Sequence, residues 1–221
     1  MKLLISALTK FLFGILLVAA LVFLPAGSLS FFGGWLFMGV LFIPILLLGV
    51  VLFIKNPSLL EKRLDGKEKE GSQKTVLALS ALVFIAGFVL GGLDYRFSWT
   101  KVHISVQIAA SVVFLLSYLL YAEVMRENAY LSRKIEVSEG QKVVDTGLYG
   151  IVRHPMYMAT TLLFLMLPLI LGSLISFAVF CSFPFILAIR IVNEEKLLKS
   201  ELDGYTEYTK KVKYRLIPFI W

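Results

Sequence analysis

The fold is decided by the run MYMATTLLFLMLPLILGSLISFAVFCSFPFILAI, residues 156–189, which contains 34 residues and no charged side chain. A helix that crosses a hydrocarbon layer of about 30 Å needs about 20 residues, so this run is too long for one comfortable span. Gly172-Ser173 lies near its middle and can turn the chain. We therefore predict a hairpin of two helices, residues 156–190, whose two ends return to the same level.

Charged and polar residues flank both ends of this hairpin. Arg153, His154 and Tyr157 stand at its start, and Arg190 and Glu194 follow its end. Ionisable groups at the mouth of an apolar hairpin are costly to place there, which makes them candidates for function. Two simpler interpretations stay open: Arg190 and Glu194 can form an intrahelical pair, and Arg153 can be an anchor that reaches the membrane interface.

Pro155 gives the first arm a defined start. Proline lacks an N–H and has a preset φ, so it suits the first turn of a helix. We expect His154 at the N-cap and Tyr157 one turn inside. The free N–H groups and positive dipole of a helix N-terminus favour a carboxylate or phosphate. The upstream Asp145-Thr-Gly147 is typical of a turn, which would bring Tyr149 alongside.

The composition is that of an integral membrane protein. Hydrophobic residues make up 58% of the 221 residues and the mean hydropathy is +0.84, whereas soluble domains are roughly 45–50% apolar. The net charge of +7 indicates cytoplasmic loops and contact with anionic membrane lipids. One cysteine and two histidines exclude a disulfide framework and a His-rich metal centre. No aromatic and basic pattern suggests a nucleic-acid partner, so we expect neither metal nor nucleic acid.

Four apolar segments precede the hairpin: residues 11–24, 31–54, 76–93 and 102–122. Lys10 breaks the apolar run that leads into the first of them, and a cleaved signal peptide within residues 1–24 is an alternative that the further spans disfavour. In the second span, close helix approach is expected at Gly33, Gly34, Gly39 and Gly49. The predicted fold is all-α: a polytopic membrane helical bundle with four spans in residues 1–122, and a region of residues 123–221 that carries the hairpin and a cytosolic pocket at its mouth.

The placement of Lys and Arg predicts the orientation. With the N-terminus inside, nearly all cations fall on one side, and only Arg96 and Lys101 fall on the other. Both termini are therefore expected in the cytoplasm. The charged connector 55–74 is expected to be a solvated loop on anionic headgroups or, alternatively, a lid that begins as a short amphipathic helix.

Other local expectations follow from turn and helix signals. They are a loop at residues 94–101, an extended segment within 134–144, helices at 193–202 and 205–213, and Gly204 as a helix C-cap.

Several blocks of the C-terminal region resemble a known family. They are Gly147-x-Tyr149-x-x-x-Arg153-His-Pro-x-Tyr157, Arg190-x-x-x-Glu194, Gly204-x-x-x-Tyr208 and Val212-x-Tyr-Arg-Leu-Ile-Pro218. In this order they resemble the isoprenylcysteine carboxyl methyltransferases and their phospholipid-methyltransferase relatives, over roughly residues 128–221. The resemblance is specific for the superfamily and weak for the substrate. A Gly commonly follows the motif tyrosine by one residue in that family, whereas Met158-Ala159 stands here.

The resemblance implies a methyltransferase that uses S-adenosyl-L-methionine as its cofactor. It implies cofactor contacts from the segment before and through the Arg-His-Pro-x-Tyr block and from one later glutamate: Gln141, Lys142, Val143, Val144, Tyr149, His154, Pro155, Met156, Tyr157 and Glu194. It also puts the arginine that holds the carboxylate of the substrate at Arg190.

The chemistry of methyl transfer determines what the site residues have to do. The nucleophile must lie in line with the methyl carbon, about 3–3.5 Å away, in a dry and fixed site, and the cofactor carries the reactive sulfonium. Arg153 and His154 suit the carboxylate of the cofactor. Tyr149 and Tyr157 suit its nucleoside. Glu194, with its neighbour Glu195, suits its ammonium group or its ribose. A carboxylate acceptor needs no general base, whereas an amine acceptor would need Glu194 or Glu195.

We therefore predict an integral membrane methyltransferase with Arg190 and Glu194 as catalytic residues. Its acceptor would be lipophilic, for example a prenylcysteine carboxylate, and would reach the site sideways from the bilayer. One alternative is a phospholipid N-methyltransferase. Another is an NADPH-dependent membrane reductase of the sterol-reductase kind, which ends in a similar Tyr-Arg-x-Ile-Pro stretch but has a longer chain with more spans. A non-enzymatic scaffold or transporter subunit would leave the ion-lined mouth without a purpose.

Overall fold

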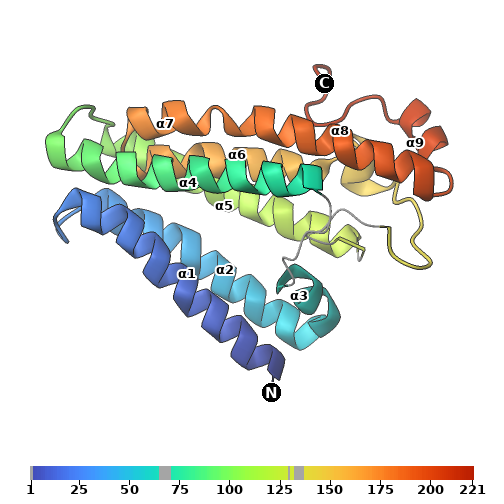
Figure 1. Cartoon of the computed structure of the whole chain (residues 1–221), viewed down its shortest axis with the longest axis horizontal. Coiled ribbons are helices and arrows are strands. Elements are labelled where there is room, and N and C mark those ends of the chain that lie inside the picture. Colours follow the sequence, from blue (N-terminus) through green and yellow to red (C-terminus); the bar gives the residue numbers. More distant parts are fainter. Residues whose placement is uncertain (1, 65–70, 129, 132–136) are drawn as a thin grey trace.

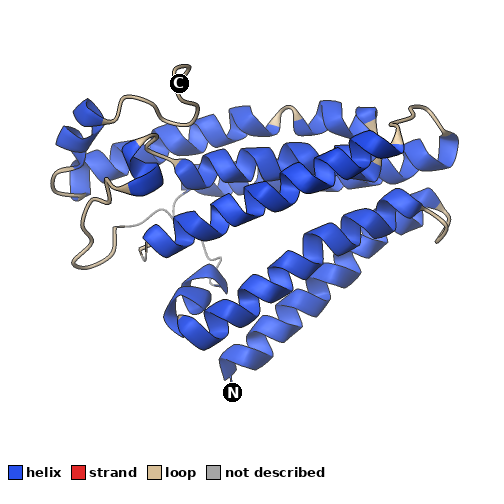
Figure 2. Ribbon diagram, turned by 180° about the vertical axis from the view of Figure 1, so that it is seen from behind, coloured by secondary structure: helices blue, strands red, loops and turns tan. Residues whose placement is uncertain are grey.

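The computed structural model describes residues 2–64, 71–128, 130–131 and 137–221 (Figure 1). Over these residues the chain consists of helices joined by turns and loops, without a strand (Figure 2). Five helices are long and apolar enough to cross a membrane, namely Lys2–Ala26, Phe32–Lys55, Lys74–Phe97, Ile104–Glu127 and Leu174–Glu201. The prediction of a polytopic all-α membrane bundle is therefore confirmed.

The first two spans are α1 (Lys2–Ala26) and α2 (Phe32–Lys55), followed by the short helix α3 (Pro57–Leu64). The helix α1 begins before the apolar segment 11–24 and continues through Lys10. Lysine is a good helix former, and its long side chain carries the ammonium away from the apolar surface. Here that ammonium donates a hydrogen bond of 2.6 Å to the carbonyl of Leu64 at the end of α3. The expected amphipathic start of the connector is α3, whereas residues 65–70 of that connector lie outside the described part.

The next pair is α4 (Gly71–Phe97) and α5 (Ile104–Glu127). The expected loop at residues 94–101 is in part wrong, because α4 continues to Phe97 and includes Asp94, which is only 1% exposed. Its carboxylate is tolerated there because it has donors on both oxygens. The N–H of Thr100 donates to Oδ1 over 2.6 Å, and the hydroxyls of Thr100 and Ser173 donate to Oδ2.

The predicted hairpin is confirmed, with its turn at the expected position. Its first arm is α6 (Pro155–Leu171), Gly172 adopts φ +85 in the turn, and the second arm consists of α7 (Leu174–Phe180) and α8 (Phe183–Glu201). The 17 residues of α6 make it about 26 Å long. Counting the same 17 residues along the second arm from Leu174 leads to Arg190. Arg190 therefore returns to the level of Pro155.

The far end of α8 differs from expectation in one detail. Leu202 is the C-cap of α8, whereas Gly204, with φ +82, is the N-cap of α9 (Tyr205–Lys211). The chain reverses between these helices, and glycine adopts the left-handed conformation of that reversal without a steric cost. The helices expected at residues 193–202 and 205–213 are otherwise present, as the end of α8 and as α9.

The helices are arranged in two groups (Figure 1). The helices α4 to α8 lie alongside one another, α5 packs along α6, and α1 packs along α4. In both views α1 and α2 diverge from the other helices towards the end of the bundle where α3 lies (Figure 2). A core of buried aromatic and aliphatic side chains, including Phe37, Phe88, Phe114 and Phe180, joins the two groups. The hairpin turn lies at one end of the bundle, and α9 and the C-terminus lie at the other.

The glycines of the second span divide into two kinds. A Cβ on Gly33 would lie 2.5 Å from the carbonyl oxygen of Leu171, and one on Gly34 would lie 2.9 Å from the ring of Phe23. Close approach is therefore confirmed at these two positions. It is wrong for Gly39 and Gly49, because a Cβ there meets nothing closer than 4.0 Å. A side chain could therefore be added at either position without a close contact.

We expect Gly33→Ala to lower the thermal stability, because the obstructing atom is a backbone oxygen at the hairpin turn and cannot move without shifting the turn. Overpacking of this kind costs about 1–3 kcal/mol. The control is Gly49→Ala in the same helix, which should be neutral or stabilising by up to about 1 kcal/mol. Unfolding midpoints in detergent measure both effects, and equal midpoints for the two variants would contradict the packing described here.

Candidate functional site

The 3₁₀ helix η1 (Gly147–Gly150) precedes the hairpin and lies at the end of the hairpin opposite its turn. A turn was predicted at this place. Gly147 has φ +53, and a Cβ at this position would lie 1.7 Å from Oε1 of Glu127. The carboxylate of Glu127 accepts a hydrogen bond of 3.1 Å from the N–H of Leu148. This contact ties η1 to the end of α5, and it leaves room only for glycine at residue 147.

The start of α6 is as predicted, with His154 at the N-cap and Pro155 in the first turn. The imidazole does not cap the helix. Instead, the backbone N–H groups of Arg153 and His154 each donate a hydrogen bond of 2.9 Å to the C-terminal segment, at the carbonyls of Tyr214 and Arg215. The segment that follows α9 is therefore held against the start of the hairpin by its main chain.

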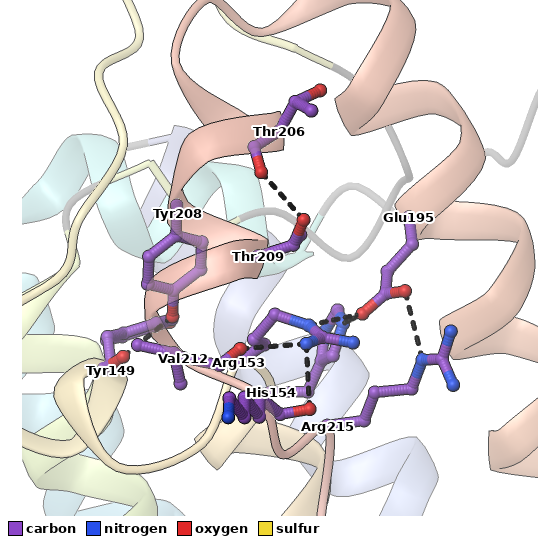
Figure 3. A network of polar contacts seen from close by, with 10 residues as sticks. Tyr149, Arg153, His154, Glu195, Thr206, Tyr208, Thr209, Val212 and Arg215 are labelled. Atoms are coloured by element: carbon purple, nitrogen blue, oxygen red, sulfur yellow. Dashed lines mark hydrogen bonds and ion pairs between the residues drawn. The ribbon is translucent and has the colours of Figure 1, made fainter.

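The carboxylate of Glu195 on α8 connects the charged groups at this place (Figure 3). Its Oε1 accepts from Nε of Arg153 over 2.7 Å and lies 3.3 Å from Nε2 of His154, while its Oε2 accepts from Nε of Arg215 over 3.0 Å. Arg153 also donates from Nη1 to the carbonyls of residues 212 and 213, over 2.8 and 2.9 Å. Glu195 is only 3% exposed, so it acts as a buried junction between α6, α8 and the C-terminal segment.

A second chain of hydrogen bonds passes through Tyr157. The Nε of Arg190 donates to its hydroxyl oxygen over 2.9 Å, and the hydroxyl donates to Oε2 of Glu194 over 2.5 Å. Tyr157 lies on the first arm, whereas Arg190 and Glu194 lie on the second. The hairpin thus brings these three side chains together at the same end of the bundle as His154.

Next to these two networks lies an open pocket of about 820 Å³, with the open space at its mouth included. It is lined by Asn128, Tyr130, Leu131, Gln141, Lys142, Val143, Val144, Tyr149, Arg153, His154, Met156, Tyr157, Glu194, Leu198, Leu202, Tyr205 and Tyr208. Most of the predicted site residues are therefore gathered around one space. Three predicted site residues are missing from this lining. Pro155 and Glu195 are adjacent in sequence to the lining residues His154 and Glu194, and Arg190 donates a hydrogen bond to the lining residue Tyr157. Within the described residues, no group of three or more His, Cys, Asp or Glu is arranged to hold a metal ion.

One wall of the pocket comes from the segment for which an extended conformation was expected. Residues 132–136 lie outside the described part, and residues 137–144 form an irregular loop around a turn at Gly140, with φ +68. Gln141 closes this turn, since its Oε1 accepts a hydrogen bond of 2.9 Å from the N–H of Ser138. The side chains of residues 141–144 then reach the pocket.

Seven lining residues were not predicted as site residues: Asn128, Tyr130, Leu131, Leu198, Leu202, Tyr205 and Tyr208. Leu198 and Leu202 follow Glu194 at intervals of four along α8, so the helical period alone could have placed them on the same face. Tyr208 belongs to a motif of the resemblance. Asn128 could be found only from the tertiary structure, in which its Nδ2 donates to the hydroxyl oxygen of Tyr149 over 3.0 Å.

Burial keeps the tyrosine hydroxyls of the pocket protonated. It raises the pKa of Tyr149, Tyr205 and Tyr208 well above the ordinary value of a phenol. The hydroxyl of Tyr208 donates to the carbonyl of Tyr149 over 2.7 Å. At the rim of the pocket, the hydrogen bond from Lys211 lowers the pKa of the Asp145 carboxyl.

Glu195→Ala is expected to destabilise the protein strongly, because it leaves the guanidinium of Arg153 buried without its carboxylate. Removal of one partner from a buried ion pair costs about 3–5 kcal/mol. Glu207→Ala is the matched control, since Glu207 pairs with Lys210 on the exposed surface of α9 and such pairs contribute at most about 1 kcal/mol. Thermal unfolding in detergent compares the two variants, and similar midpoints would mean that Glu195 is not a structural junction.

Comparison with known proteins agrees with this geometry. The sequence model of the isoprenylcysteine carboxyl methyltransferase (ICMT) family matches residues 107–200, which run from the first turn of α5 through the hairpin to the end of α8. The match starts before the motifs noted in the sequence and ends ahead of the block Gly204–Tyr208. No curated protein matches the chain. The match to the ICMT family over residues 107–200, together with the five membrane-length helices among the described residues, supports a membrane methyltransferase.

Proposed function

We propose that the chain transfers a methyl group from S-adenosyl-L-methionine to the carboxylate of a lipophilic acceptor of the prenylcysteine kind. The observation that carries this proposal is the convergence on one pocket of residues 141–144, the turn at His154 and the carboxylate of Glu194. These groups come from three separate segments, and they are the ones that the resemblance implies for the cofactor. The active region would be residues 123–221, on the cytoplasmic side with both termini, as the distribution of Lys and Arg favours.

The pocket offers complementary groups for each part of this cofactor, which supplies the activated methyl group when bound. Glu194 is an acceptor for the ammonium or the ribose hydroxyls. Its Oε1 makes none of the hydrogen bonds found among the described residues, whereas Oε2 accepts from Tyr157. Likewise, Nη2 of Arg153 is not used in the contacts that hold this side chain. A charge-assisted contact from this nitrogen and from the N-terminus of α6 would suit the cofactor carboxylate.

The acceptor carboxylate is assigned to Arg190. This guanidinium is 8% exposed and donates to Tyr157, whose hydroxyl also reaches Glu194. Orientation is the main requirement for an ionised carboxylate, because it is already a nucleophile and has no proton to lose. A side chain fixed in this way can hold the acceptor oxygen in line with the methyl carbon. Glu194 then contributes by fixing the cofactor rather than by removing a proton.

The occupied carboxylates favour this acceptor over the amine of a phospholipid. An amine nucleophile needs a base that is able to take its proton. Both oxygens of Glu195 already accept from Arg153, His154 or Arg215, and we assign Glu195 to positioning the turn of Arg153 and His154. Glu194 would have to give up the contacts proposed above. Carboxyl methylation requires neither change.

The lipophilic part of the acceptor has a place beside the pocket. An apolar cavity, about 2100 Å³ with the open space at its mouth included, lies between α1, α2, α3, α5 and α6. It adjoins the pocket at the first turns of α6, where Thr160 lines the cavity and Met156 lines the pocket. Nη2 of Arg63, another residue of the cavity, lies 3.5 Å from the sulfur of Met156. A hydrocarbon chain in this cavity would gain about 25 cal/mol for each Å² of apolar surface it buries.

Replacing either His154 or Glu194 by alanine is expected to abolish measurable binding of S-adenosylhomocysteine, because each change removes a polar group from the proposed cofactor site. Isothermal titration calorimetry on the detergent-solubilised protein measures this binding. NADPH serves as the comparison ligand in a thermal-shift assay, and it should not stabilise the wild-type protein. Stabilisation by NADPH and not by S-adenosylhomocysteine would favour a reductase, and retained binding in both variants would contradict the proposed site.

Arg190→Lys should lower kcat/KM for a prenylcysteine analogue by about 10- to 100-fold, the effect of losing a hydrogen bond to a charged group. Lysine keeps the charge but not the planar guanidinium that a carboxylate pairs with. Labelled S-adenosyl-L-methionine provides the rate, and identification of the labelled product in membrane extracts identifies the acceptor. Calorimetry with S-adenosylhomocysteine should show a much smaller change. An equal loss in cofactor affinity would argue against a role in holding the acceptor.

A further inference from the structure

The pocket has two walls of different chemistry. The charged wall, with Arg153, His154 and Glu194, belongs to the networks described above. The other wall is formed by a hydrophobic cluster in which Leu202, Tyr205, Tyr208 and Val212 are buried, and in which Val143 and Leu198 pack against them. Five of these six side chains line the pocket. A ligand held between the walls therefore meets charged groups on one side and a mainly apolar surface on the other.

One polar atom in this apolar wall is unused. Among the buried side-chain nitrogen and oxygen atoms of the described residues, only the hydroxyl of Tyr205 and Oε1 of Gln107 lack a hydrogen-bond partner. Gln107 lies beside Gly172 at the hairpin turn, away from the pocket. Tyr205 itself is only 4% exposed. A buried hydroxyl without a partner is destabilising, so each such group calls for an explanation.

We propose that the hydroxyl of Tyr205 hydrogen bonds the nucleoside part of the cofactor. The inference rests on the proposed function, since it takes S-adenosyl-L-methionine as the ligand. The apolar wall suits a flat base, which gains from apolar contact and aromatic neighbours. Such side chains cannot satisfy the ring nitrogens of the base or the oxygens of the ribose. The one unpaired hydroxyl of this wall can.

The electrostatic surroundings of Tyr205 favour the nucleoside over the amino-acid end of the cofactor. Burial, then the negative charges of Glu195 and Glu194, raise the pKa of this phenol, so it is a neutral donor at physiological pH. At Tyr205 a third carboxylate, that of the cofactor, would meet these two charges, which the nearby Arg153 offsets only in part. A neutral acceptor on the base or the ribose would not be repelled.

The test compares two ligands on the full-length chain in detergent. S-adenosylhomocysteine contains the nucleoside and the amino-acid end, and 5′-methylthioadenosine contains the nucleoside alone. Tyr205→Phe is expected to weaken both by the same factor, roughly 3- to 10-fold for a lost neutral hydrogen bond. The ligand-free variant should unfold at the same temperature or a higher one, because an unpaired buried hydroxyl has been removed.

Tyr208→Phe is the matched control from the same wall. Its hydroxyl is paired with the carbonyl of Tyr149, so this variant should unfold at a lower temperature than the wild type, the opposite of Tyr205→Phe. Unchanged affinities in Tyr205→Phe would overturn the proposal, as would a loss confined to S-adenosylhomocysteine, which would place the contact at the amino-acid end. A lower unfolding temperature of Tyr205→Phe would assign the hydroxyl to the fold. If the wild type bound neither ligand, the proposed function itself would fail.

Discussion

The reversal of the chain at Gly172 and Ser173 is the constraint on which the site depends. It sets α6 and the second arm side by side, so that Arg190 returns to the level of Pro155. The turn is held by the buried carboxylate of Asp94, which accepts a hydrogen bond from the hydroxyl of Ser173. A shift of the second arm by one residue would turn its side chains by about 100° and take Arg190 and Glu194 away from Tyr157. Polar contacts at one end of the bundle thereby fix geometry at the other.

The charged end shows how a membrane protein keeps two arginines close together. Arg153 and Arg215 share the carboxylate of Glu195, with His154 beside them. Buried ion pairs contribute little to net stability, because desolvation offsets the attraction, but their loss leaves an uncompensated charge. Their value here is geometric. They hold the C-terminal segment against the start of α6, and two main-chain hydrogen bonds from residues 153 and 154 complete that contact.

The pocket lies close to both charged and apolar surfaces, as the proposed cofactor and acceptor would require. Its charged wall comes from both arms of the hairpin, its apolar wall from the end of α8 and from α9, and the apolar cavity adjoins it at Met156. Methyl transfer joins such unlike reactants only if each is desolvated and held in line. The divergence of α1 and α2 from the other helices (Figure 1) leaves the cavity open beside the site.

The sequence by itself determined the class of the protein and the place of the hairpin, because apolar length, charge-free runs and a glycine turn act locally. It also predicted the helix start at His154 and Pro155, because the position of a proline is a local signal, and it predicted that the hairpin returns Glu194 to the same end of the bundle. It could not show that Asp94 is buried, that Glu195 joins two arginines, or that Tyr205 lines the pocket and has a buried hydroxyl without a partner. Those facts depend on which distant segments supply the hydrogen-bond partners, and only the packing of the helices decides that.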